Sequence, residues 1–458
     1  MIPIFTSRRD EIRRIFGLAW PVMLTSLNWT LMHLIDVAIV GRIGTAELGV
    51  LAAGRSITFI TIVVGIAAMS GVLVSAARAD GAGNALETGD IWRRGLLLGG
   101  LIGTVLCALL LVSADLLMRG IGVAPDLAGG GAAVVRAMAV AYPAQFLSIA
   151  SAFFLEGISR PRRVMVINLG VLPVNAVLAW AWAGGHFGLP AWGAVGAVLA
   201  TAVASTLAML AMIASVWWID EARTRGIRCV AWVDWRRAAR GLWPLARFGL
   251  VPGLAAGFEV AGFAWLIVLS TQFGAVAAAA FQTMLSLHNF GFAMSMGFGS
   301  AAGVRAGNAM GEGLPLAATA RGVLAAIMAV LVTGGFGLLA YCAPYGLIAP
   351  FSSDPAVVSL AVAMLFGLAP FMLFDALQVV LVNVLRAMGD QVVAGVNTMF
   401  GFFIVTGIGG WWMVRHGGGP MVLIWAAAGG MLLVALLQSA RLWWLRRQLM
   451  KISRRSAS

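Results

Sequence analysis

The sequence has few charged residues for its length. Only 11% of its 458 residues are Asp, Glu, Lys or Arg, whereas 61% are hydrophobic and the mean hydropathy is +0.95. A soluble globular domain carries roughly 25% charged residues, so this composition excludes that class of protein. No stretch between the apolar runs is long or polar enough to form a soluble domain of its own.

Cysteines and enzyme motifs are also scarce. The three cysteines are an odd number, which argues against a framework of disulfide bonds, and we expect Cys107, Cys229 and Cys342 to act as small apolar side chains. The chain lacks His-Glu-x-x-His, a Walker phosphate loop, Gly-x-Ser-x-Gly and any Cys/His cluster with metal-ligand spacing. We therefore expect no enzyme activity, no cofactor and no transport driven by ATP on this chain.

Long apolar runs recur along the whole chain, and each can cross a hydrocarbon layer about 30 Å thick as a helix. The basic residues before the first run are not followed by a small-x-small cleavage site, so we expect no cleaved signal peptide. The predicted fold class is all-α integral membrane protein, with twelve transmembrane helices. They begin near residues 14, 48, 91, 133, 163, 192, 241, 278, 316, 356, 392 and 420.

The net charge of +13 is explained by the distribution of Lys and Arg between the spans. If the N-terminus lies in the cytoplasm, 26 of the 31 basic residues fall on the cytoplasmic side, four in the outer loops and one, Arg55, within a span. Positive residues concentrate on the cytoplasmic side of membrane proteins. We therefore predict that both termini are cytoplasmic, and we expect no nucleic-acid partner.

The two halves of the chain repeat at an offset of 230 residues. Gly44 and Gly274 open the second and eighth spans, Gly81 and Gly311 end them, and the same offset aligns Ser159 with Gly389. Six spans, an even number, separate equivalent points, which predicts a parallel repeat of two six-helix lobes. Substrate is then expected between the lobes, with alternating access produced by one lobe rocking against the other.

This repeat predicts four parts of the chain. They are a first lobe with spans 1–6 at residues 1–219, a basic cytoplasmic linker at 220–240, a second lobe with spans 7–12 at 241–446, and a basic cytoplasmic tail at 447–458. The basic residues of the linker region predict contact with anionic lipid headgroups. A regulatory or partner-binding role is the alternative.

Two acidic residues, Glu259 and Asp375, lie near the middle of predicted spans, with no Lys or Arg near them in either span. A carboxylate there costs roughly 2.5–3.5 kcal/mol on insertion scales and usually marks an ion or substrate path. Neighbouring carboxylates repel each other and lose hydration, and a cation relieves both penalties. We predict that this pair holds Na⁺ or H⁺. The alternative is two protonated acids that bond to the backbone or to Gln378 and Gln282.

A third acid, Asp36, lies only five residues before Gly41, and Arg55 lies about two helical turns into the next span from the same side. One interpretation is an Asp36–Arg55 ion pair that joins two helices, and the other is a role in protonation or substrate contact. The remaining polar residues within spans more often form hydrogen bonds between helices than ligand sites. They include Asn28, His33, Asn168, Asn175, His288 and Asn289.

At these residues the chain resembles a known family. Trp20-Pro21 and Asp36-Val37-Ala38-Ile39-Val40-Gly41-Arg42-Ile43-Gly44 resemble the first-span signature of multidrug and toxic compound extrusion (MATE) transporters. Glu259, Pro370 with Asp375, and Leu385-Arg386-Ala387-Met388-Gly389-Asp390 are similar to the NorM branch of that family. The resemblance covers essentially the whole chain.

The resemblance implies a secondary active exporter in the cytoplasmic (inner) membrane of a bacterium. Its expected partners are amphipathic, often cationic, drugs and dyes, a coupling ion that is Na⁺ or H⁺, and membrane lipids, and we expect a monomer. The acids that match Glu259 and Asp375 would bind the coupling cation, and both would be metal ligands if that cation is Na⁺. The acid that matches Asp36 would be protonated or contact substrate.

The resemblance also suggests supporting residues around these acids. Asn175 is the expected supporting residue in the first lobe, and Gln282 and Gln378 are expected in the second. Arg55 and Phe371 are further expected supporting residues. Phe371 stands one turn before Asp375, where some relatives have a tyrosine, so it lacks the hydroxyl group that a tyrosine would bring to the cation site.

Three other functions were weighed against export. A flippase for a lipid-linked precursor shares this architecture but needs a strongly basic cavity, whereas the spans offer Arg55 and three acids. A receptor or assembly scaffold leaves the repeat and the acids within spans unexplained. A major-facilitator carrier would need Gly-x-x-x-Asp-Arg-x-Gly-Arg-Arg after its second span, and the chain lacks this motif.

Overall fold

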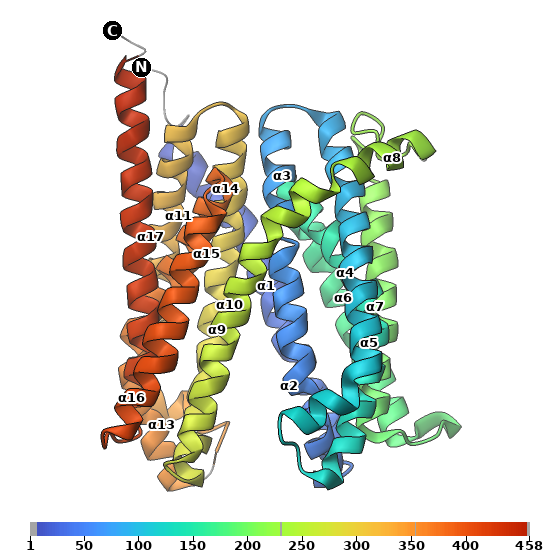
Figure 1. The fold of residues 1–458 in the computed structure, drawn as a ribbon, viewed down its shortest axis with the longest axis vertical. Coiled ribbons are helices and arrows are strands. Elements are labelled where there is room, and N and C mark those ends of the chain that lie inside the picture. The colour runs from blue at the N-terminus through green and yellow to red at the C-terminus, as the bar shows by residue number, and fades with distance from the viewer. Residues whose placement is uncertain (1–6, 230, 353, 456–458) are drawn as a thin grey trace. The chain divides into compact units, whose positions relative to one another are not determined.

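The computed structural model describes residues 7–229, 231–352 and 354–455, and in this part of the chain all regular structure is helical (Figure 1). Twelve long helical segments are found among these residues, which confirms the predicted fold class. They are α1 (Arg8–Gly41), α2 with α3 (Thr45–Ala68, Ser70–Gly81), α4 (Ala85–Gly120), α5 (Pro125–Gly157), α6 (Pro161–Gly184), α7 (Gly193–Trp217), α9 (Leu242–Thr271), α10 (Ala275–Gly311), α11 (Pro315–Cys342), α13 with α14 (Pro355–Leu368, Met372–Met388), α15 with α16 (Gln391–Phe400, Gly410–Arg415) and α17 (Val422–Arg455).

Eleven of these segments are long and apolar enough to cross a membrane by length and composition. The remaining one, α10, has 37 residues but is less apolar, because it carries polar side chains such as Gln282, His288 and Arg305. Five short elements complete the described chain. They are η1 (His186–Gly188), α8 (Trp232–Arg240), α12 (Pro344–Ile348), η2 (Ala369–Phe371) and η3 (Gly401–Gly409), of which η3 is a π-helix.

The helix boundaries confirm the internal repeat. The second span, α2 with α3, and the eighth span, α10, both cover 37 residues, and 230 positions separate their starts. Gly83 and Gly313, in the turns that follow, have φ of 70° and 73°, and Ser159 and Gly389 have φ of 63° and 91°. The same left-handed turn therefore ends equivalent helices in both halves, and glycine is the residue that adopts this conformation without strain.

Contacts between residues divide the chain into two units. The first unit contains Leu27–Asp80 and Asn84–Gly253, and the second contains Met1–Ser26, Gly81–Gly83 and Leu254–Ser458. Two helices, α1 and α9, and the last residue of α3 divide between the units, whereas the predicted lobes keep each of these helices in one part. The boundaries of the lobes, linker and tail therefore stay a prediction from the sequence.

A buried ion-pair cluster in the second unit fixes the beginning of α1 to α10 and α11. Arg305 on α10 contacts both carboxylate oxygens of Glu11 at 2.7 and 2.8 Å. Arg321 on α11 lies 3.9 Å from Glu11 and 2.9 Å from Glu312. Glu11, Arg305 and Arg321 are each less than a tenth exposed, so the start of α1 packs with the second unit.

The central basic segment is tied to the first unit by side-chain contacts. Arg225 donates hydrogen bonds to Asp80 at 2.8 Å and to Thr88 at 2.9 Å, and Arg160 binds both carboxylate oxygens of Glu221 at 2.5 and 2.7 Å. The part of the predicted linker before α8 therefore folds onto the ends of α3, α4 and α6. Contact of the linker with lipid headgroups remains a prediction.

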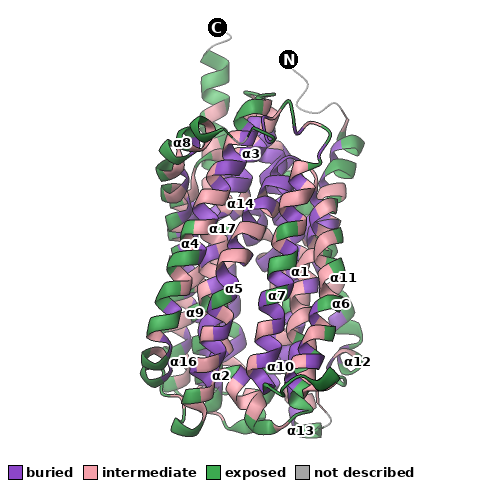
Figure 2. Cartoon of the chain, turned by 90° about the vertical axis from the view of Figure 1, so that its right-hand side faces the viewer, coloured by how far each residue is buried: buried purple, intermediate pink, exposed green. Residues whose placement is uncertain are grey.

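Individual helices carry buried residues along one side and exposed residues along another (Figure 2). The exposed residues of the spans are largely apolar; on α4, for example, Val112 is 86% exposed and Leu116 is 72% exposed. Such side chains face lipid without cost, because hydrocarbon is as apolar as they are. Small residues let helices approach closely within each unit: a Cβ atom added at Gly249 on α9 would lie 1.8 Å from the carbonyl oxygen of Ala68 on α2.

Candidate ion-coupling sites

A break in the tenth span positions Asp375. Pro370 has no backbone N–H and cannot make the regular helical hydrogen bond, and the chain forms the 3₁₀ turn η2 between α13 and α14 at this residue. The new helix, α14, starts at Met372, so Asp375 lies in its first turn. The N–H groups of a first turn favour a negative charge, which makes this a suitable place for a buried carboxylate.

Asp375 is 2% exposed, and the side chains of Gln378, His288 and Ser295 interact with its carboxylate. Gln378, one turn later on α14, donates from Nε2 to Asp375 Oδ1 at 3.4 Å. Nε2 of His288, on α10, lies 3.7 Å from Asp375 Oδ2 and has no hydrogen-bond partner. This separation is too long for a hydrogen bond but allows an ion pair if the imidazole is protonated. The imidazole ring lies between the rings of Phe263 and Phe292, at centroid distances of 5.9 and 6.3 Å.

Glu259, on α9, belongs to the same cluster. Its carboxylate interacts with the side chain of Gln378 and with the charges of Asp375 and Arg386. Glu259 is half-buried. The structure therefore brings the carboxylates of Glu259 and Asp375 together around the side-chain amide of Gln378. This arrangement supplies the oxygen atoms that a cation site needs.

One basic residue acts electrostatically on Glu259, although the described residues form no ion pair between Lys or Arg and either acid. Arg386, on α14, interacts electrostatically with Glu259 although it follows Asp375 by eleven residues in the sequence. The number of residues between Arg386 and Asp375 on α14 does not show how far Arg386 lies from Glu259, because Glu259 is on another helix. That distance depends on how α9 and α14 pack against each other. The sequence does not predict that His288 lies beside Asp375. It shows only that His288 is a polar residue within a span, and such residues more often form hydrogen bonds between helices.

Two predicted supporting residues are not part of this cluster. Gln282 on α10 is exposed, and its side chain forms no hydrogen bond with either acid in the described structure. The ring of Phe371 packs edge-on against Trp425 at 5.8 Å and lies 6.2 Å from Phe374. His288 occupies the position beside Asp375 that was expected for Gln282.

The first unit contains a second buried carboxylate with different partners. Asp36 on α1 is 1% exposed and forms an ion pair with Arg55 on α2 at 2.6 Å. Asn175 on α6 donates to the other carboxylate oxygen at 3.1 Å, and Thr201 on α7 also interacts with this carboxylate. Arg55 additionally donates to the carbonyl oxygen of His33 at 3.2 Å. Arg55 and Asn175 therefore both bind the carboxylate of Asp36.

The chain was compared with known proteins. The MatE family model matches residues 21–181 and, a second time, residues 255–412, one segment in each half of the chain. The chain belongs to the MatE family. The double match agrees with the internal repeat and with the predicted resemblance to MATE transporters.

Relatives of this MatE chain include named resistance proteins. The probable multidrug resistance protein NorM of Caulobacter vibrioides is 32% identical, over 89% of this chain and 85% of its own length. The multidrug resistance protein PmpM of Pseudomonas aeruginosa is 28% identical, over 86% of this chain and 82% of its own length. Among solved structures, the eukaryotic MATE transporter AtDTX14 superposes with a TM-score of 0.84 over 98% of this chain and 99% of that chain, at 19% identity. That structure therefore supports the fold.

The side chains of this MatE chain suit a hard monovalent cation or a proton better than a transition metal. Among the described residues there is no group of three or more His, Cys, Asp or Glu that could hold a metal ion. Carboxylate and amide oxygens are the ligands that hard cations prefer. Glu259, Asp375 and Gln378 supply such oxygens, whereas in the first unit the guanidinium of Arg55 already lies against Asp36.

Proposed function

We propose that this chain is a secondary active multidrug exporter. In this proposal, entry of Na⁺ or H⁺ drives the efflux of amphipathic, often cationic, small molecules by antiport and alternating access, and Glu259 with Asp375 forms the coupling site. The observation that carries the proposal is the cluster of Glu259, Gln378 and Asp375 within two membrane-spanning helices, α9 and α14. The names of the relatives NorM and PmpM support drugs as the exported class.

The chemistry of the cluster supports ion coupling. Two carboxylates share one amide donor, and no arginine contacts Asp375 as Arg55 contacts Asp36 in the part of the chain that the structure describes. Binding of Na⁺ or H⁺ reduces the repulsion between the acids and the cost of burying their charge. The two carboxylates can take up a proton as well as a hard metal cation such as Na⁺.

A flippase for a lipid-linked precursor remains the alternative from the sequence, and the two candidate sites do not favour it. Such a precursor carries negative phosphates, which require free basic side chains. At these sites Arg55 is paired with Asp36, and Arg386 interacts with Glu259. The charge of Arg55 is therefore compensated, and the charge of Arg386 is offset in part by Glu259.

The test is substrate efflux from proteoliposomes under an imposed Na⁺ gradient and, separately, an imposed pH gradient. Wild-type protein should export a fluorescent cation under at least one gradient, and Glu259→Gln and Asp375→Asn should reduce this efflux to the level of protein-free vesicles. Both variants should insert normally, since neutralising an acid removes a penalty of roughly 2.5–3.5 kcal/mol.

Asp126→Asn provides the matched control for this test. Asp126 is an exposed carboxylate in the first turn of α5, and its substitution removes the same charge outside both candidate sites. This variant should export like the wild type. Normal gradient-driven efflux by Glu259→Gln and Asp375→Asn would place the coupling site elsewhere in the chain.

A further inference from the structure

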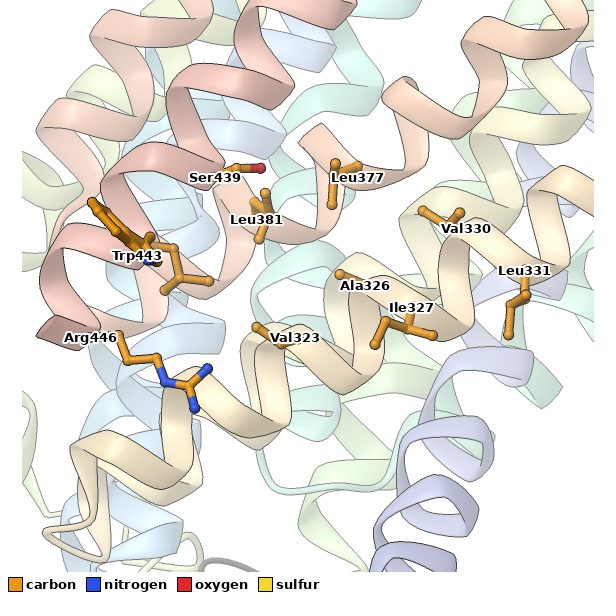
Figure 3. A pocket seen from close by; sticks show the side chains of 11 residues that line it. Val323, Ala326, Ile327, Val330, Leu331, Leu377, Leu381, Ser439, Trp443 and Arg446 are labelled. Atoms are coloured by element: carbon orange, nitrogen blue, oxygen red, sulfur yellow. The ribbon is translucent and has the colours of Figure 1, made fainter. Parts of the chain in front are cut away.

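A groove of about 380 Å³ lies between α11, α14 and α17 of the second unit, away from both candidate ion-coupling sites (Figure 3). Its floor is buried and apolar, with Ala326, Leu381 and Leu442 each at most 5% exposed. Its rim is exposed and also apolar, and includes Ile327 at 52% and Leu331 at 69%. We expect an apolar groove open along the side of three membrane-spanning helices to face the hydrocarbon of the bilayer.

One end of the groove is basic. Arg446 lies beside Val323 at this end, whereas Val330 and Leu331 mark the other end (Figure 3). Arg446 is exposed and forms no ion pair with a described residue, and no acidic side chain lines the groove. The groove is therefore amphipathic along its length, with a single uncompensated positive charge at one end.

Aromatic and basic residues around Arg446 mark the level of the membrane interface. The guanidinium of Arg447 lies 3.5 Å from the ring centre of Trp443, and that of Arg441 lies 4.5 Å from the ring centre of Trp444. Tryptophan and arginine gather where hydrocarbon meets the headgroups. From Val323, the apolar part of the groove follows α11 for eight residues, or about 12 Å at 1.5 Å per residue, to Leu331.

We propose that this groove binds one anionic phospholipid, whose phosphate pairs with Arg446 and whose acyl chain lies along α11 between Val323 and Leu331. Charge complementarity supports this occupant, because an arginine forms strong, directional hydrogen bonds with a phosphate. Basic pockets between membrane-spanning helices bind the headgroups of anionic lipids in this way. A cationic drug is disfavoured, since its charge would meet Arg446.

The bound lipid packs against the helix that carries the candidate coupling site. Leu377 and Leu381 of α14 line the groove, whereas Asp375 and Gln378 belong to the ion cluster. With 100° between successive residues, Leu377 and Asp375 project from nearly opposite faces of this helix. The lipid site is thus separate from the ion site, and its test does not depend on transport.

The experiment measures lipid binding to purified full-length protein by native mass spectrometry, with phosphatidylglycerol and phosphatidylcholine of identical acyl chains. Wild-type protein should retain phosphatidylglycerol roughly five-fold better, the effect expected for one basic residue at an anionic surface. Arg446→Gln should abolish this preference. Val330→Trp, which fills the groove, should weaken binding of both lipids.

Lys451→Gln is the matched control, since it removes one positive charge further along α17 outside the groove and should leave the preference unchanged. A soluble headgroup, glycerol 3-phosphate, should not compete at the lipid concentrations used, because it lacks the acyl chain. The proposal is overturned if the wild type binds both lipids equally, if Lys451→Gln acts like Arg446→Gln, if glycerol 3-phosphate displaces the lipid, or if a cationic dye displaces it preferentially.

Discussion

At the scale of single residues, the deeply placed acids differ in the partners that compensate their charge. Asp36 contacts the permanent cation Arg55 at 2.6 Å and accepts a further hydrogen bond from Asn175. Asp375 has the neutral amide of Gln378, the hydroxyl of Ser295 and the imidazole of His288 beside it, and no arginine pairs with it among the described residues. An acid already paired with arginine gains little from a second cation, whereas Asp375 gains much, which favours the second unit as the site of ion coupling.

The Asp36–Arg55 pair can be tested by substituting its members singly and together. Asp36→Asn or Arg55→Gln leaves one charge in an apolar site without its partner, which costs about 3–5 kcal/mol in buried pairs. We expect a loss near the lower limit, because the Arg55 side chain is 21% exposed and partly screened. The double variant should regain most of the stability, as measured by thermal unfolding in detergent. A stable Asp36→Asn protein that no longer exports would instead assign Asp36 to transport.

At the scale of elements, helix contacts in the first unit depend on glycines at the crossing points. Gly249 on α9 faces the backbone of α2, where an added Cβ atom would lie 1.8 Å from the carbonyl oxygen of Ala68. The backbone carbonyl cannot move aside without shifting the helix. Close packing of this kind is a main source of attraction between helices in lipid, where no hydrophobic effect drives them together.

Alanine substitutions at two glycines test this packing. Gly249→Ala should lower the free energy of unfolding by about 1–3 kcal/mol, the usual cost of overpacking. Gly170→Ala is the control: Gly170 lies inside α6 with no atom within 4 Å of an added Cβ, so the change should be neutral or slightly stabilising. Thermal unfolding of both purified variants measures the difference. Equal stability of the two variants would contradict the close crossing of α9 and α2.

At the scale of the whole molecule, the distribution of basic residues predicts the orientation in the membrane. In a protein with all three cysteines replaced, a cysteine at Thr224 or at Ser458 should be protected from an impermeant reagent in intact cells. Phe187→Cys should react, since Phe187 lies between α6 and α7 on the predicted outer side and is 79% exposed. Thr224 is itself exposed, so protection reflects the membrane rather than burial. Labelling at Thr224 or Ser458 from outside would overturn the orientation.

Coupling also makes a prediction about binding by the whole transporter. If ion and drug compete for one conformation, each must weaken the binding of the other by the same factor, typically about 5- to 150-fold. The affinity of purified protein for a fluorescent cation should therefore fall as the coupling ion is added, and Asp375→Asn should flatten this response. The measurement is a dye titration across Na⁺ concentration and pH. Affinity that is indifferent to both would exclude competitive coupling.

The energy available supports this scheme. One positive charge that enters down a potential of about 100 mV releases about 2.3 kcal/mol. Because each 1.4 kcal/mol corresponds to a factor of ten, this sustains a gradient of about fifty-fold for a drug without net charge. Exchange of one ion for one singly charged cationic drug moves no net charge, so the concentration gradient of the ion drives that export.

The sequence by itself determined the membrane spans and their repeat. In lipid, every backbone polar group must be satisfied within its own segment, so a long apolar run has almost no alternative to a helix. The conformation of the turn glycines also depends only on the local sequence. Gly83 and Gly313 occur 230 positions apart, in the two repeats, and adopt the same left-handed conformation. The positions of Asp36, Glu259 and Asp375 within spans followed from hydropathy alone.

Only the tertiary structure decided which side chains meet these acids. His288 and Gln282 both lie on α10, but His288 lies beside Asp375 whereas Gln282 is exposed. Arg386 acts electrostatically on Glu259 from another helix, which no spacing in the sequence indicated. The physical reason is that a helical residue's direction is set locally, at 100° per residue, whereas the rotation and level of one helix against another depend on the packing of all its neighbours.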